Sequence, residues 1–227
     1  MNKGRLFTFG CSYTSFNWWT WADILGNNAN EFQNWGLTGG GNQFIFNSVY
    51  ECNQRNQFTA DDTVIVCWTG TTRMDWYKGG HWSSLGNVYT QPLFDRKLLD
   101  MFADERGFLL RDLPFVAAVR RLLEQTKVAW YFLSMLDFDS EHKDITDLYQ
   151  DSLSFFRPSF ETVLHGRKPL SFDLHPSPAE HLAYLDKVLP EITIPENTRL
   201  KVAEQDSIIR SPGYQMPQYQ RTKVKRI

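Results

Sequence analysis

The sequence predicts one α/β domain, in which helices cover both faces of a mostly parallel sheet. Short apolar or β-favouring stretches alternate along the chain with segments whose apolar residues recur at helical spacing. The clearest strand, residues 63–68 (TVIVCW), has no polar face, which is typical of a parallel strand buried on both sides. The 227 residues are enough for a single domain with a sizeable core.

The first quarter of the chain predicts two strands and two helices. Residues 5–9 form an apolar strand that ends at Gly10, and Thr14 or Ser15 is expected to cap a helix that runs to about residue 25. A short strand is expected in residues 31–36 (EFQNWG). A glycine loop then leads into a helix marked by apolar residues at helical spacing: Phe44, Ile45, Val49 and Cys52.

The remaining elements continue the alternation of strand and helix. Residues 73–110 are rich in glycine and aromatic residues without a clean period, and we expect an irregular insertion beside the strand ends. A helix is expected at residues 112–126, a buried strand within residues 127–136 and helical structure in residues 140–156. Pro178 is expected in the first turn of a further helix.

The end of the chain differs in composition from the rest. We expect the domain to occupy residues 1–195 and a basic arm to follow at residues 196–227. From Ser207 onward no acidic residue occurs, and five residues are basic: Arg210, Arg221, Lys223, Lys225 and Arg226. The arm is expected to wrap its own domain or a neighbouring subunit in a homo-oligomer, and a nucleic-acid contact is the weaker alternative.

The overall composition limits the classes of function. With 42% hydrophobic and 22% charged residues and a net charge of −2, the chain gives no reason to expect nucleic-acid or membrane binding. Cys11, Cys52 and Cys67 match no zinc or disulfide spacing, so we expect reduced thiols. The N-terminus lacks the features of a signal peptide, and no apolar run approaches the ~20 residues of a membrane span. A cytoplasmic location is expected, in a host cell or a virion if the protein is viral.

Two nucleophiles, Cys11 and Ser12, follow the first strand. Ligands bind at the carboxyl ends of strands in open α/β sheets, and a helix starting here would add N–H groups for an oxyanion. A serine requires a base, and among the five histidines His175 is favoured because Asp173 can orient its ring. His181 is expected to be structural, and Cys11 to point into the core, with Cys11 chemistry kept as an alternative.

Three short motifs resemble a known family. FTFGCSYT, residues 7–14, is similar to block I of the SGNH (GDSL-type) hydrolases, in a divergent Gly-Cys-Ser form that resembles bacteriophage-encoded members. NWGLTGGGN, residues 34–42, resembles block II, and DLHPSPAEH, residues 173–181, resembles block V. The resemblance spans about residues 5–190. It implies a three-layer α/β/α sandwich with a flavodoxin-like sheet. The sequence contains no nucleotide-binding or metal-binding motif, so we expect no cofactor and no metal.

The resemblance also implies roles for particular residues. Ser12 would be the nucleophile, His175 its base and Asp173 the partner that orients the base. The backbone N–H groups of Ser12 and Gly39 would donate to the oxyanion.

The sequence departs from the family in two places. The block III asparagine, the family's third oxyanion donor, is missing from CWTGTTRMDW; Thr71 is its nearest positional substitute, and Asn42 is another candidate. The Asp-x-His spacing is one residue shorter than the family's Asp-x-x-His. In the same segment as Thr71, Arg73 and Asp75 are expected to form a structural ion pair, with recognition of an anionic substrate by Arg73 as the alternative.

These residues predict a serine esterase that acts on a small acyl ester, such as an O-acetyl group linked to a glycan. Acyl transfer to another alcohol would use the same groups. The alternative is a catalytically silent SGNH-like protein used for binding or assembly, for instance in a virus particle. The missing asparagine and the basic tail favour that alternative.

Overall fold

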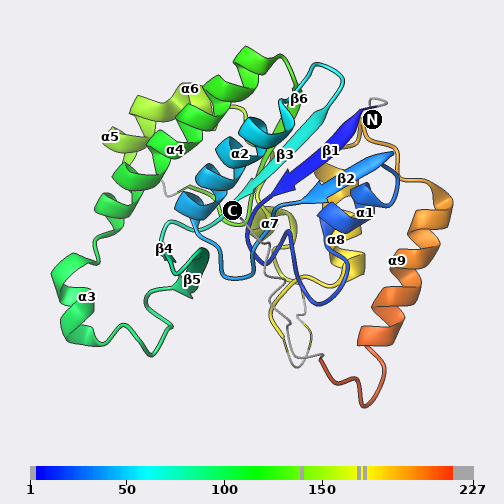
Figure 1. The fold of residues 1–227 in the computed structure, drawn as a ribbon. Helices are drawn as coiled ribbons and strands as arrows, with labels where there is room; N and C mark the ends of the chain where they lie inside the picture. The colour runs from blue at the N-terminus through cyan, green and yellow to red at the C-terminus, as the bar shows by residue number, and fades with distance from the viewer. Residues whose placement is uncertain (1–3, 139–140, 168–169, 171–172, 217–227) are drawn as a thin grey trace.

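Four parallel strands form the central sheet of the computed structural model, which describes residues 4–138, 141–167, 170 and 173–216 (Figure 1). They are β1 (Arg5–Phe9), β2 (Glu31–Asn34), β3 (Thr63–Trp68) and β6 (Ala129–Ser134). Their spatial order is β2-β1-β3-β6. The parallel pairing confirms the predicted parallel sheet. The strand order matches the first four strands of a flavodoxin-like sheet, whose order is 2-1-3-4-5.

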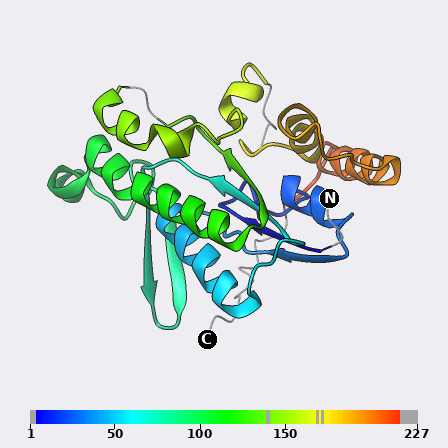
Figure 2. The same ribbon diagram turned by 90° about the horizontal axis from the view of Figure 1, so that it is seen from above.

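Helices cover both faces of this sheet, as the view from above shows (Figure 2). One layer contains α2 (Asn42–Asn56) and α4 (Glu105–Thr126). The other layer contains α1 (Trp21–Gly26) and α8 (Pro178–Val188). The predicted three-layer α/β/α sandwich is therefore confirmed.

Strand β3 contributes to the cores on both faces of the sheet. Val64 and Val66 pack in the cluster with α2 and α4, whereas Ile65 and Cys67 pack in the cluster with α1 and α8. Successive side chains of a strand point to opposite faces, so a central parallel strand must be apolar at consecutive positions. Every residue of β3 is buried, as the sequence predicts.

The first helix begins later than predicted. Helix α1 starts at Trp21 with Thr20 as its N-cap, and the Thr20 N–H donates to the Asp23 carboxylate at 2.9 Å. The predicted caps, Thr14 and Ser15, lie instead in a turn, where their N–H groups donate to Cys11 O at 2.9 and 3.1 Å. Ser12 therefore does not belong to the first turn of α1, the part of a helix to which the effect of the dipole is confined.

The insertion at residues 73–110 contains regular structure that the sequence did not predict. Strands β4 (Arg73–Lys78) and β5 (His81–Asn87) form an antiparallel hairpin, and α3 (Arg96–Phe102) follows. Gly79 and Gly80, with φ angles of 63° and 81°, form the two-residue turn of the hairpin. Two positive φ angles are the signature of a type I′ turn, which matches the twist of the strands that it joins.

The segments after the hairpin agree in type with the predictions but differ in extent. Helix α4 begins at Glu105 rather than at residue 112, because the Asp104 carboxylate caps it by accepting from the Gly107 N–H at 2.9 Å. The helical region expected at residues 140–156 is divided into three short helices: α5 (Lys143–Thr146), η1 (Asp147–Tyr149) and α6 (Gln150–Leu153). A further short helix, α7 (Phe160–Val163), follows it.

A helix occupies the start of the segment that the sequence assigned to a basic arm. This helix, α9 (Glu196–Ile209), packs on α8 and buries Val202. The Asn27 amide donates to Thr198 Oγ1 at 2.9 Å, which joins α9 to the end of α1. Four of the five basic residues of the expected arm lie outside the described residues: Arg221, Lys223, Lys225 and Arg226.

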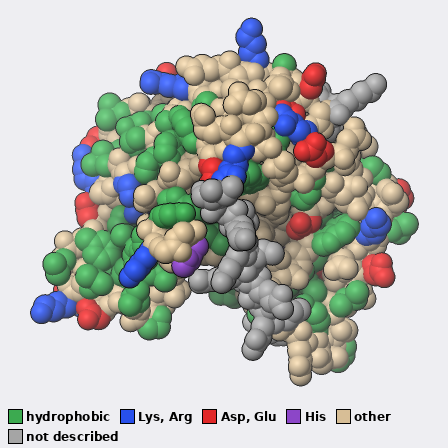
Figure 3. Space-filling view, in the orientation of Figure 1, with side chains coloured by type: hydrophobic (Ala, Val, Ile, Leu, Met, Phe, Trp, Pro, Cys, Tyr) green, Lys and Arg blue, Asp and Glu red, His purple; other side chains and the backbone are tan. Residues whose placement is uncertain are grey.

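Several apolar side chains are exposed on the insertion, which lies at the lower left of the space-filling view (Figure 3). They include Tyr77, Tyr89, Leu93, Leu98 and Met101. Within the part of the chain that the structure describes, none of the helices has the length and hydropathy required to cross a membrane.

We predict that the Arg5–Asp62 pair at the start of the sheet makes stability depend on pH. Burial alone would raise the pKa of Asp62, but hydrogen bonds from Arg5 and Thr59 lower it to about 2. The carboxylate therefore contributes stability above its unfolded pKa, and this is lost as the pH falls from about 4 to about 2. Asp62→Asn should lower the free energy of unfolding by about 2 kcal/mol at pH 7 and by much less at pH 2.5, in urea titrations. An equal effect at both pH values would contradict the prediction.

Candidate active site

The loop that carries Ser12 lies at the carboxyl ends of β1 and β3, where the chain order of the sheet reverses. This switch point is where open α/β sheets bind ligands. Gly10 is required there because a Cβ would overlap Thr14 Oγ1 and lie 2.8 Å from Cys67 O. The turn buries Cys11 completely and leaves Ser12 with 3% of its surface exposed.

The loop of residues 36–41 is tied directly to the Ser12 loop. The Leu37 N–H donates to Gly10 O at 3.0 Å, and Thr38 Oγ1 donates to Ser15 O at 2.8 Å. Gly39 has a φ of 82°, which side chains other than glycine rarely adopt. Among the described residues, the backbone N–H groups of Ser12 and Gly39 donate to no protein acceptor, so both are available to a ligand.

Asp173 and His175 form a pair near the other end of the chain. Asp173 Oδ1 lies 2.6 Å from His175 Nδ1 and also accepts the His175 backbone N–H at 2.7 Å. The carboxylate thus spans two residues as in an Asx turn, which explains how the short Asp-x-His spacing still brings carboxylate and ring together. With Nδ1 as the donor, the unprotonated Nε2 of a neutral ring is left as a base.

Aromatic contacts dock His175 on the Ser12 loop. The Phe16 ring stacks on the imidazole with centroids 3.9 Å apart, and the Tyr13 ring lies edge-on at 5.7 Å. The indole Nε1 of Trp18 donates to Pro176 O at 2.8 Å in a buried position. The structure therefore brings the neighbours of Ser12 and the predicted base into contact.

The surroundings of His175 favour its neutral form. Burial lowers the pKa of the imidazole, and the hydrogen bond that the ring donates to Asp173 acts in the opposite direction. The charges of Arg73 and Arg167 lower the pKa further, and the net result is a pKa below the ordinary value of 6.5. The side chain keeps 27% of its surface exposed. A neutral, partly accessible imidazole can accept a proton at neutral pH.

Asn42 has a structural role, which corrects the expectation that it donates to an oxyanion. The side chain is fully buried, and its two amide hydrogens are engaged by Thr69 O at 3.0 Å and Asp112 Oδ2 at 2.8 Å. Its Oδ1 accepts the Thr69 N–H at 2.9 Å. Asn42 thus fixes the segment after β3 to α2 and α4, and no amide hydrogen remains for a substrate.

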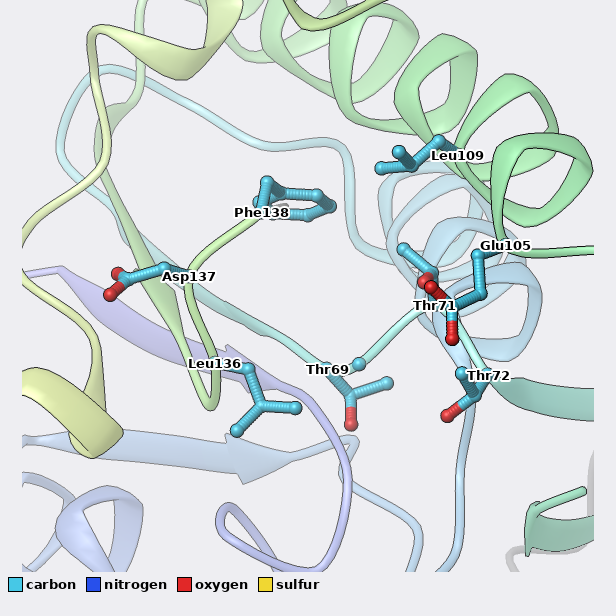
Figure 4. A pocket seen from close by; sticks show the side chains of 9 residues that line it. Thr69, Thr71, Thr72, Glu105, Leu109, Leu136, Asp137 and Phe138 are labelled. Atoms are coloured by element: carbon cyan, nitrogen blue, oxygen red, sulfur yellow. The ribbon is translucent and has the colours of Figure 1, made fainter. Parts of the chain in front are cut away.

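Thr71 lines a cavity of about 190 Å³ that follows the end of β3 (Figure 4). Threonines of the β3 end, two carboxylates and apolar side chains surround it: Thr69, Thr71, Thr72, Glu105, Leu109, Leu136, Asp137 and Phe138. The Thr71 carbonyl accepts from Arg111 at 2.6 Å, which fixes the backbone at this point. The structure shows no contact between Thr71 and the Ser12 loop, and its role as an oxyanion donor stays a prediction.

A second cavity, of about 230 Å³, lies beside the Ser12 loop and the loop that carries His175. Tyr13, the neighbour of Ser12, and Pro176, the neighbour of His175, both line it. Its other lining residues are Met135, Leu136, Phe160, Glu161, Leu164 and Arg167. The lining combines apolar side chains with the charged Glu161 and Arg167, and its volume suits a small group held beside the two loops.

Arg73 and Asp75 do not form the predicted ion pair. Asp75 instead caps α2 from outside: its carboxylate accepts the N–H groups of Gly41 at 2.8 Å and Phe44 at 2.9 Å, and the Ser84 hydroxyl at 2.6 Å. A carboxylate at a helix N-terminus satisfies N–H groups that have no partner within the helix. A Cβ at Gly41 would lie 2.6 Å from Asp75 Oδ2, so this close approach requires glycine.

The other candidate nucleophile and histidine are in the core. Cys11, Cys52 and Cys67 are all free and buried, and burial raises the pKa of the Cys67 thiol well above its usual range. His181 is 1% exposed, and burial lowers its pKa to about 3. Its ring packs against Phe160 at 5.3 Å and Tyr13 at 6.2 Å, consistent with a structural role. Among the described residues no group of three or more His, Cys, Asp and Glu side chains is arranged to hold a metal ion.

Solved structures offer a comparison for the chain as a whole. A lipolytic protein of the G-D-S-L family from Veillonella parvula is 12% identical, with 82% of this chain and 96% of that chain covered and a TM-score of 0.46. A psychrotrophic esterase from Pseudoalteromonas sp. is 10% identical, with 82% and 97% covered and a TM-score of 0.47. A carbohydrate esterase is 12% identical, with 87% and 70% covered and a TM-score of 0.49.

No family model and no curated protein matches the sequence. At these identities and TM-scores, the structural likenesses assign neither residue roles nor a substrate.

We predict that the bond from Trp18 to Pro176 is a main support of the site. Trp18→Phe keeps an aromatic ring but leaves the buried Pro176 carbonyl without its donor, so the free energy of unfolding should fall by about 2 kcal/mol. Trp19→Phe is the matched control, because Trp19 is only half-buried, and it should cost less than about 1 kcal/mol. Urea unfolding followed by circular dichroism measures both. Equal losses of unfolding free energy in the two variants would show that the bond from Trp18 to Pro176 adds no stability beyond that of an ordinary tryptophan contact.

Proposed function

We propose that this protein is a serine ester hydrolase with Ser12 as the nucleophile and His175 as the general base. The observation that carries the proposal is that His175, oriented by Asp173 at 2.6 Å, stacks on the loop that contains Ser12. Nucleophile, base and orienting carboxylate in one site are the groups that acyl transfer by serine requires.

In the proposed mechanism, Ser12 Oγ attacks the acyl carbon while His175 Nε2 takes its proton. Asp173 holds the Nδ1–H tautomer and stabilises the imidazolium that forms. The N–H groups of Ser12 and Gly39 donate to the oxyanion of the tetrahedral intermediate. The imidazolium then protonates the leaving alcohol, and a water molecule, deprotonated by the same base, releases the acyl group from Ser12.

The proposed substrate is a small acyl ester, such as an acetyl group on a carbohydrate hydroxyl. The cavity of about 230 Å³ beside Tyr13 and Pro176 supports a small acyl group rather than a long chain. Exposed aromatic side chains on the insertion, among them Tyr77 and Tyr89, are of the kind that pack against sugars. Transfer to an alcohol other than water would use the same groups.

We predict that Ser12→Ala and His175→Ala each lower kcat/KM for p-nitrophenyl acetate by about 10⁴-fold or more, because each removes one half of the nucleophile–base pair. Ser15→Ala, in the same loop, is the matched control and should retain activity. Cys11→Ala should also retain it.

The outcome of this assay also separates the alternatives. Background rates for the wild type on p-nitrophenyl acetate and on acetylated glycans would favour the silent binding or assembly protein, whether viral or not. Activity that survives Ser12→Ala but is abolished by iodoacetamide would favour Cys11 instead.

The pH profile gives an independent prediction. Because the pKa of His175 lies below 6.5, more than half of the base is neutral at pH 6.5, and the acid limb of kcat/KM should be centred below that pH. Asp173 raises the pKa of His175, so Asp173→Asn should lower the rate and also move the acid limb to lower pH. Initial rates between about pH 4 and about pH 8 test this. An acid limb centred above pH 6.5 in the wild type would contradict the assignment.

A further inference from the structure

Arg73 differs from the other arginines that the structure describes. All of these except Arg73 and Arg121 lie within 4.0 Å of a carboxylate oxygen: Arg5, Arg55, Arg96, Arg106, Arg111, Arg120, Arg157, Arg167, Arg199 and Arg210. Arg121 is exposed on α4, where water solvates its charge. Arg73 is half-buried, so its charge is partly removed from water without a carboxylate partner among the described residues.

The hydrogen bonds of Arg73 leave part of its guanidinium group uncommitted. Nη1 donates to Gly40 O at 3.2 Å, and Nη2 lies 3.5 Å from Met135 Sδ. Neither partner carries a charge, and a guanidinium group has five N–H donors. The nearby carboxylate of Asp75 is already occupied by the N-terminus of α2 and by Ser84.

These contacts place the guanidinium group at the proposed catalytic site. Gly40 follows Gly39, whose N–H is one of the two proposed oxyanion donors, and Met135 lines the cavity of about 230 Å³ that Tyr13 and Pro176 also line. The charge of Arg73 is close enough to His175 and Tyr13 to shift their ionisation. Arg167 also lines the cavity, but Glu180 neutralises it at 3.1 Å.

We propose that Arg73 recognises an anionic group on the substrate, so that the ester hydrolysed here carries a carboxylate or a comparable anion in its acyl or its alcohol half. This inference rests on the proposed function of the site. A charge that is partly withdrawn from water is stabilised by a counter-charge, and the planar guanidinium group matches a carboxylate with two parallel hydrogen bonds. The alternative partner of Arg73 is the oxyanion of the tetrahedral intermediate. That oxyanion exists only transiently, so it would leave Arg73 without a counter-charge in the complex with the substrate.

Two matched substrate pairs test the proposal and identify which half carries the anion. 4-Nitrophenyl hemisuccinate against 4-nitrophenyl butyrate places the carboxylate in the acyl half, and 4-acetoxybenzoate against its methyl ester places it in the alcohol half. The wild type should prefer the anionic member of at least one pair by about 10-fold or more in kcat/KM. This preference should shrink as the ionic strength rises from about 0.01 M to about 1 M.

Variants of Arg73 distinguish recognition of an anion from other roles. Arg73→Gln should remove the preference while the neutral esters keep most of their rate, and Arg73→Lys should retain part of it. Arg121→Gln is the matched control and should leave the preference unchanged. Equal losses on neutral and anionic esters in Arg73→Gln would assign Arg73 to the oxyanion and overturn the proposal, as would a wild type without preference in either pair. If Arg73→Gln does not fold, the salt dependence in the wild type decides.

A binding measurement separates failure of this proposal from failure of the esterase assignment. Monomethyl succinate and methyl butyrate are titrated calorimetrically into Ser12→Ala and into Ser12→Ala combined with Arg73→Gln. Binding of monomethyl succinate alone, abolished by the second substitution, supports anion recognition even if the wild type hydrolyses no ester. 4-Acetoxybenzoate and its methyl ester are titrated in the same way for the alcohol half. Equal binding of the charged and the neutral member in both pairs, or binding of none of the four ligands, overturns the proposal.

Discussion

One buried hydrogen bond, from the Trp18 indole to Pro176 O at 2.8 Å, joins segments 158 residues apart and makes one site of them. The stacking of Phe16 on His175 at 3.9 Å lies beside it. A buried carbonyl without a hydrogen-bond donor lowers the stability of the fold, so any conformation that separates Trp18 from Pro176 is disfavoured. Neither loop belongs to a helix or strand, so this bond and the contacts of Phe16 and Tyr13 with His175 together set the position of the ring relative to the Ser12 loop.

Buried polar groups fix the remaining loops of the site. Asn42 connects the segment after β3 to Asp112 on α4, and Asp75 caps α2 and thereby sets the path of the glycine loop. Each of these side chains is satisfied by several partners, which is the condition under which a buried polar network specifies a structure. The sequence offers Asn42 as a candidate oxyanion donor, whereas its bonds make it a support for the loops of the candidate site.

The charges around the site are arranged asymmetrically. Asp173 is engaged by His175, and Glu180 is engaged by Arg167, so neither carboxylate neutralises Arg73. Burial is the main cause that lowers the pKa of His175, and the charges of Arg73 and Arg167 add to it, against the opposing effect of Asp173. The charge of Arg73 therefore bears both on the pKa of the proposed base and on the anion recognition proposed above.

The sequence by itself determined the local features: the parallel β3, apolar at consecutive positions, the order of strands and helices, and the Asp173–His175 pair, whose two-residue spacing closes an Asx turn. Tertiary structure decided other features. The packing of α9 on α8 and the bonds of Asn42, Arg73 and Asp75 depend on partners far away in the chain. The start of α1 and the hairpin instead follow local signals that the sequence-based predictions did not use: the Thr20–Asp23 capping box and the Gly79-Gly80 turn. The physical reason is that a polar or charged side chain bonds to whichever partner the packing of the layers brings within about 3 Å. Spacing along the sequence predicts only partners that are a few residues away.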